Sequence, residues 1–159
     1  MMMRTVLTLS SWLLLLSAPA ALASNTQALT WNNLLAPGES AQAPVEPTQH
    51  TQVATQPTGE VNPAWDQHDI SLPGYAVPLE GDGQIVTSFL LVPFFGACIH
   101  VPPPPTNQVV LVKVPQGVPA DDLWDAIKVE GILHVQSTHH DLADAGYQLD
   151  AASVKPYMP

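Results

Sequence analysis

The chain has 159 residues, of which 14 are acidic and four are Lys or Arg, so its formal net charge at pH 7 is −10. An acidic surface repels phosphate backbones, which argues against nucleic acid as a partner. The length suits one domain with an extension, and the single cysteine excludes an internal disulfide bond.

The first 23 residues have the pattern of a secretory signal peptide. Arg4 precedes an apolar run from Val6 to Leu16, and an Ala-Leu-Ala cleavage motif ends at Ala23. A membrane-spanning helix needs roughly 20 apolar residues, and this run is shorter. We therefore expect cleavage near Ala23, export to the periplasm and no stable membrane anchor.

Residues 24–64 are predicted to hold a short docking segment and a linker. Leu29–Leu35, with Trp31 among them, could pack on the domain as a turn of helix or could remain disordered, and the sequence leaves both open. From Ala36 to Pro63, proline, glutamine and threonine are frequent and apolar periodicity is absent. That composition is typical of a flexible linker.

Residues 65–159 are predicted to form a β-barrel domain. Alternating apolar residues or short apolar runs, separated by glycine and proline, indicate five strands near residues 69–80, 85–95, 107–114, 127–135 and 145–157. A single helical turn around Leu123 is expected before the fourth strand, and Gly131 marks a bend within it. The expected fold is a small, partly open five-stranded barrel of the OB type. A small β-sandwich is the alternative.

Several segments together resemble one protein family. They are LTWNNLLAPG, LPGYAVPLE, FLLVPFFGACIHVPPPPTNQVV and AGYQLDAASVKPY. They are similar to the bacterial domain of unknown function 3299 family, and the block around Cys98 is the most specific of them. The resemblance implies an exported protein that accompanies a transport system. A transport-system component or another periplasmic protein is therefore the expected partner.

Cys98 and His100 are the first candidates for a metal site. In an extended chain they would point to the same side, with Cα atoms about 6.5 Å apart. Thiolate and imidazole together suit zinc or copper, and the prolines at 102–105 would hold the backbone stiff. Because structural zinc normally has four ligands, one or both of His139 and His140 are expected to complete the site.

Two other roles for Cys98 stay open. A lone cysteine in an apolar stretch is commonly a small buried hydrophobe. A cysteine nucleophile would need a base within hydrogen-bond reach and an oxyanion site, and neither is indicated, so we expect no catalytic residues.

The sequence thus predicts a periplasmic accessory protein that binds zinc or copper, or assists a transport system, without catalytic turnover. The alternative is a metal-free protein-interaction module with Cys98 buried. Trp65 and Trp124 are expected in the core or at its rim.

Overall fold

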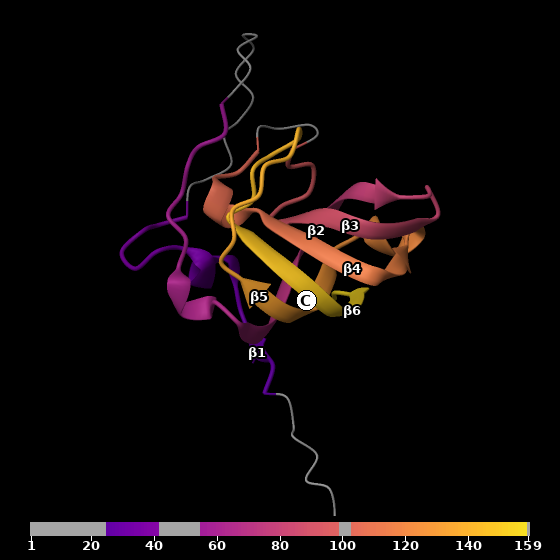
Figure 1. Ribbon diagram of the computed structural model, residues 1–159, viewed down its shortest axis with the longest axis horizontal. Helices are drawn as coiled ribbons and strands as arrows, with labels where there is room; N and C mark the ends of the chain where they lie inside the picture. Colours follow the sequence, from indigo (N-terminus) through magenta and orange to yellow (C-terminus); the bar gives the residue numbers. More distant parts are fainter. Residues whose placement is uncertain (1–24, 42–54, 99–102, 159) are drawn as a thin grey trace, which may run out of the picture.

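The computed structural model describes residues 25–41, 55–98 and 103–158, and its regular structure is mainly β (Figure 1). The strands are β1 (Gln27–Ala28), β2 (His68–Gly81), β3 (Ile85–Val92), β4 (Val110–Pro119), β5 (Ile127–His134) and β6 (Tyr147–Pro156). The described helices are short 3-10 turns: η1 (Trp31–Leu34), η2 (Pro63–Trp65), η3 (Thr106–Gln108) and η4 (Ala120–Leu123). No helix in the described ranges is long and apolar enough to cross a membrane.

Five of these strands form a closed barrel. β2, β3, β4, β6 and β5 are hydrogen-bonded in that order, and the pairing of β2 with β5 closes the ring. β4 and β6 run parallel, whereas the other neighbours in the ring are antiparallel. The small all-β barrel expected from the sequence is confirmed, and β1 is an additional strand outside the ring.

β2 pairs with both β5 and β3, and it changes partner at Gly74. Its first half pairs with β5 as far as Gly74 opposite Ile127, and its second half pairs with β3 from Tyr75 opposite Val92. A Cβ atom at position 74 would lie 2.8 Å from the carbonyl oxygen of Val92. Glycine therefore allows the strands to approach closely where the partner changes.

Two apolar clusters lie on the two faces of the barrel wall. Successive side chains of a strand point to opposite faces, so Phe89 and Leu91 of β3 join the larger inner cluster, whereas Leu90 and Val92 join the smaller outer cluster. The inner cluster fills the barrel. The outer cluster consists of Val77, Leu90, Val92, Ala97, Val109, Leu111, Ala143 and Ala145.

The N-terminal segment is built into the inner cluster. Leu29 is 4% exposed and Leu34 is fully buried. β1 pairs parallel with β2, and the hydroxyl of Tyr147 in β6 donates a 2.6 Å hydrogen bond to the carbonyl oxygen of Leu34. Of the two alternatives that the sequence left open for this segment, docking on the core is the correct one.

Residues 55–63, which composition assigned to the linker, contact the barrel domain. Gln56 Nε2 donates to the carbonyl oxygens of Pro104 at 2.9 Å and Asp144 at 2.8 Å, and Asp144 N–H donates to Gln56 Oε1 at 2.7 Å. The linker interpretation does not hold here because hydrogen bonds, rather than a periodic apolar face, hold the segment. The expected signal peptide and linker residues 42–54 lie outside the described residues.

Candidate functional site

Cys98 lies in a turn rather than in a strand. β3 ends at Val92, and the chain then turns so that Cys98 adopts a φ of 67°, in the left-handed region. The expectation that Cys98 and His100 point to the same side assumed an extended backbone at Cys98, and that assumption was wrong. Side chains alternate between two faces only where the backbone is extended, and a residue with this φ is not extended. His100 itself lies outside the described residues.

The thiol of Cys98 is partly buried against the outer cluster. Burial raises its pKa from the ordinary 9.0 to about 11, because removal from water disfavours the charged thiolate. At neutral pH the group is therefore a protonated thiol. A nucleophilic role, which needs the thiolate, is correspondingly disfavoured.

His139 and His140 have different surroundings although they are adjacent. The exposed ring of His139 contacts Asp144, with 2.5 Å between Nδ1 and Oδ1. Nε2 of His140 is buried without a hydrogen-bond partner among the described atoms. His140 borders a shallow depression together with Leu79 and Glu80 of β2.

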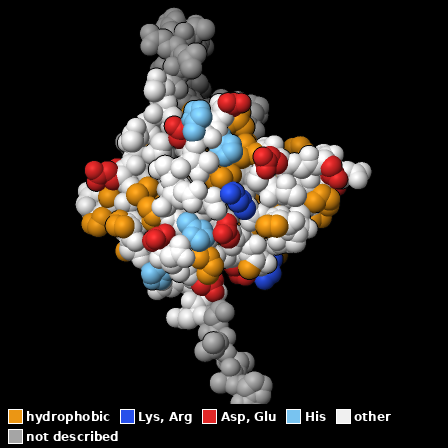
Figure 2. Space-filling view, viewed as in Figure 1, with side chains coloured by type: hydrophobic (Ala, Val, Ile, Leu, Met, Phe, Trp, Pro, Cys, Tyr) orange, Lys and Arg blue, Asp and Glu red, His pale blue; other side chains and the backbone are white. Residues whose placement is uncertain are grey.

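The predicted metal ligands do not form a recognisable cluster within the described residues. No group of three or more His, Cys, Asp or Glu side chains there is arranged to hold a metal ion. On the face shown in Figure 2, histidine and acidic side chains are spread over the surface rather than gathered in one place. The site proposed at Cys98, His100, His139 and His140 therefore stays a prediction that depends on His100.

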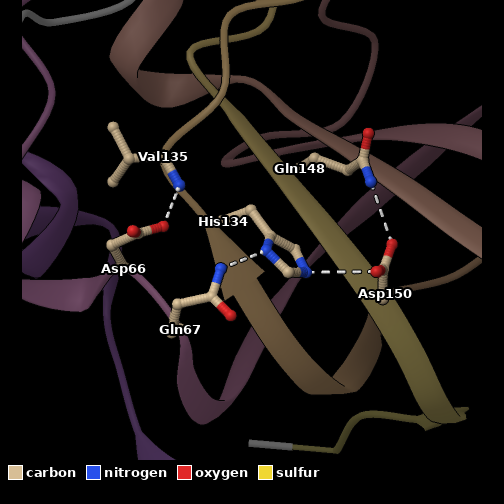
Figure 3. A network of polar contacts seen from close by, with 6 residues as sticks. All are labelled: Asp66, Gln67, His134, Val135, Gln148 and Asp150. Carbon is tan, nitrogen blue, oxygen red and sulfur yellow. Dashed lines mark hydrogen bonds and ion pairs between the residues drawn. The ribbon is translucent and has the colours of Figure 1, made fainter.

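A polar network at one end of the barrel holds another histidine (Figure 3). The amide nitrogen of Gln67 lies 2.7 Å from Nδ1 of His134, and Nε2 of His134 lies 3.1 Å from Oδ2 of Asp150. Because an amide nitrogen only donates, Nδ1 accepts from Gln67, and Nε2 is the ring nitrogen that donates to the carboxylate. Gln148 also donates to Asp150, at 3.0 Å. Both ring nitrogens are engaged, which indicates that His134 ties the chain before β2 to β5 and β6.

An apolar groove lies between the second half of β2 and η4. Its volume is about 290 Å³. Its lining residues include Ala76, Val77 and Pro78 of β2, Phe95 in the turn after β3, and Leu123 and Trp124 at the end of η4. Phe95 is 70% exposed and Trp124 is 73% exposed. Two large aromatic side chains thus border an apolar groove without being buried.

Local geometry explains why these two aromatic residues face solvent. The one-turn η4 sends Leu123 into the inner cluster, where it is 5% exposed, and the next side chain, Trp124, points outward. Likewise Phe94 packs against the outer cluster, whereas Phe95 turns away from it. The Phe95 ring meets Tyr75 edge to face, with 6.0 Å between the ring centres. This arrangement is favourable for aromatic pairs and holds Phe95 beside the groove.

Comparison with known proteins places this barrel in a family. The chain matches the family model described as "Protein of unknown function (DUF3299)" over residues 15–156. It belongs to the DUF3299 family. The crystal structure of a DUF3299 family protein from Pseudomonas aeruginosa PAO1 is 42% identical in sequence, with a TM-score of 0.76. The match covers 84% of this chain and 97% of that one. No match was found among curated proteins.

The family resemblance expected from the sequence is therefore confirmed for this DUF3299 protein, whereas the groove was missed. The available signal was the pair of doublets Phe94-Phe95 and Leu123-Trp124. Each doublet places two large side chains at adjacent positions, and a short turn can bury only one of them. Trp124, expected in the core or at its rim, is instead largely exposed.

Proposed function

We propose that this protein is an exported, non-catalytic accessory module that binds another protein through the groove lined by Phe95 and Trp124. The observation that carries the proposal is the exposure of these two side chains, at 70% and 73%, in the lining of an apolar groove. Exposed apolar patches of this kind are typical of interaction surfaces. Aromatic residues, Trp above all, contribute much of the binding energy in protein interfaces.

The state of the candidate nucleophile supports a role without turnover. The pKa of Cys98 is raised to about 11, so little thiolate is present at neutral pH. The ring nitrogens of His134, in the polar network of Figure 3, are both engaged in contacts. The periplasmic location is proposed from the signal-peptide pattern of residues 1–23, and a transport-system protein is the proposed partner class.

Site-specific photocrosslinking in the producing cell tests this function. A benzophenone amino acid is placed at position 95 or 124 of the full chain, with position 158 as the control. Met158 is 90% exposed and is not among the residues that line the groove. We expect a discrete crosslinked protein from positions 95 and 124 and none from position 158. Equal labelling at all three positions, or none at any, would contradict a groove-mediated function.

Zinc or copper binding is the second candidate function. The observation in its favour is that Nε2 of His140 is shielded from solvent and lacks a partner among the described atoms. This nitrogen would need Cys98 and His100 as further ligands.

A further inference from the structure

β2 has an unpaired backbone edge beside the groove. Its first half is paired on both edges, since Ile70 is opposite Gly131 of β5 on one side and Gln27 of β1 on the other. Its second half pairs with β3 on one edge, and no strand in the described ranges pairs with the other. β5 begins only at Ile127, opposite Gly74. The groove therefore lies where the pairing with β5 would otherwise continue.

Two hydrogen bonds identify which residues of β2 face which edge. The carbonyl oxygen of Ser71 accepts from Leu29 N–H at 2.8 Å, and that of Pro73 accepts from the indole N–H of Trp31 at 2.8 Å. Both donors belong to the N-terminal segment, on the edge opposite β5. In a strand the N–H and C=O of one residue point to the same edge, and those of the next residue point to the other. The backbone N–H and C=O groups of the odd-numbered residues in this part of β2 therefore point away from β5.

By the same alternation, the backbone groups of Ala76 and Pro78 point to the open edge of β2. Those of Val77 point to β3. Pro78 supports this assignment because it has no N–H and suits a position where no ladder donor is required. The open edge thus offers the N–H and C=O of Ala76 and the C=O of Pro78. Ala76 and Pro78 line the same groove as the two exposed aromatic side chains.

We propose that an extended segment of the partner protein adds to β2 along residues 76–78 as a further strand. The proposal rests on the proposed function and specifies how the partner binds. Backbone hydrogen bonds hold the added strand, and its alternate side chains fill the groove, as in other cases of strand addition. The other edge of β2 already accepts such an addition from outside the ring, because β1 is a two-residue strand paired with Ile70 and Ser71.

Charge defines the chemistry of the partner segment. Asp121, Asp122 and Asp125 surround Trp124 in sequence and are exposed, and none of them forms an ion pair with a described residue. The partner segment therefore carries Lys or Arg beside its apolar residues, which would complement the carboxylates that flank Trp124 in sequence. A second copy of the chain is disfavoured as the occupant, because it would bring the same carboxylates and a net charge of −10.

A pair of proline substitutions tests the edge assignment without any partner. Ala76→Pro removes an N–H that makes no ladder bond, so we expect the melting temperature to change by less than about 2 °C. Val77→Pro removes an N–H that bonds β3, so we expect a loss of about 5 °C or more, or failure to fold. Equal destabilisation by both substitutions would overturn the assignment.

Selection of random ten-residue displayed peptides on the full protein tests the binding mode. Peptides that also bind the Trp124→Ala variant are removed by counter-selection. Because Trp124 is exposed, this substitution leaves the core intact. We expect alternating apolar residues flanked by Lys or Arg. N-methylation of the best synthetic peptide should weaken binding by about tenfold at every second residue and little at the residues between. Replacing Asp121, Asp122 and Asp125 with Asn should weaken binding and reduce its dependence on salt.

The outcomes separate this proposal from the function on which it rests. Peptides that require Trp124 but tolerate N-methylation at every position would overturn strand addition and keep the groove as a binding site. If no selected peptide depends on Trp124, both proposals fail. Self-association that is lost in Trp124→Ala, measured by analytical ultracentrifugation, would overturn the assignment of a basic partner in favour of a second copy.

Discussion

The indole N–H of Trp31 donates a 2.8 Å hydrogen bond to the carbonyl oxygen of Pro73, which lies 42 positions later in the chain. The bond joins the N-terminal segment to β2 one residue before β2 exchanges β5 for β3 at Gly74. A side chain thus provides a donor at the point where β1 has ended and β3 has not yet begun its pairing with β2.

Trp31→Phe should therefore lower the free energy of unfolding by about 1 kcal/mol, because the Pro73 carbonyl loses its donor while most of the ring volume remains. Trp124→Phe is the matched control, since Trp124 is 73% exposed and should change stability little. Urea denaturation of both variants measures the difference. Equal effects of the two substitutions would show that the Trp31 hydrogen bond does not stabilise the fold.

Tyr147 should make stability depend on alkaline pH. Burial raises its pKa from 10.0 to about 12, so the folded state favours the neutral phenol. Because the folded pKa lies above the unfolded one, the stabilisation is complete below about pH 10 and is lost as the pH rises to about 12. The free energy of unfolding, followed from pH 8 to 12, should fall more in the wild type than in Tyr147→Phe.

The same variant should be less stable at pH 8, where the phenol is neutral. It lacks the hydroxyl that donates to Leu34 O at 2.6 Å and accepts from Asn62 N–H at 2.5 Å. Parallel pH profiles for wild type and Tyr147→Phe would argue against a raised pKa at this position.

Cys98 should react slowly in the folded protein. With its pKa raised from 9.0 to about 11, the thiolate fraction at pH 8 is about 100-fold lower than in the unfolded chain. Maleimide labelling at pH 8, compared with labelling in denaturant, measures this protection. Protection by burial alone is insensitive to a chelator, so faster labelling after chelation would indicate a bound metal instead.

Zinc or copper binding at the predicted site has a separate test. Cys98→Ser and His100→Ala should each abolish metal uptake. Wild-type affinity should fall as the pH drops, because the thiol and the imidazole must be deprotonated to bind. Metal analysis of the purified protein beside a thermal melt checks this. Unchanged uptake with a lowered melting temperature would remove both residues from the site.

The sequence was sufficient to predict a small barrel because each strand has its own alternation of apolar residues or its own short apolar run. Alternation in β5, for example, places Val129 and Leu133 in the inner cluster. Docking of the N-terminal segment could not be predicted, because it depends on contacts between distant residues such as Leu34 and Tyr147. Local composition contains no signal for such a contact, and the same holds for Gln56 and Asp144.

The candidate site was harder to predict for a local reason. Strand alternation at Cys98 and His100 requires a strand that continues beyond Phe95, whereas the chain turns there and Cys98 has positive φ. The exposure of Trp124 depends on how η4 meets the barrel, which determines that Leu123 rather than its neighbour is buried. The open edge of β2 follows only from pairing partners that the sequence does not specify.

Closure of the ring by β2 and β5 also has a consequence for the order of folding. The hairpin of β2 and β3 joins neighbouring strands, but the β2–β5 and parallel β4–β6 pairings bring together strands separated by other elements. Such long-range pairings slow folding because a large loop must close before they contribute. The ring cannot close until β6 is available to pair with both β4 and β5. A chain that ends before β6 should therefore not form the closed barrel.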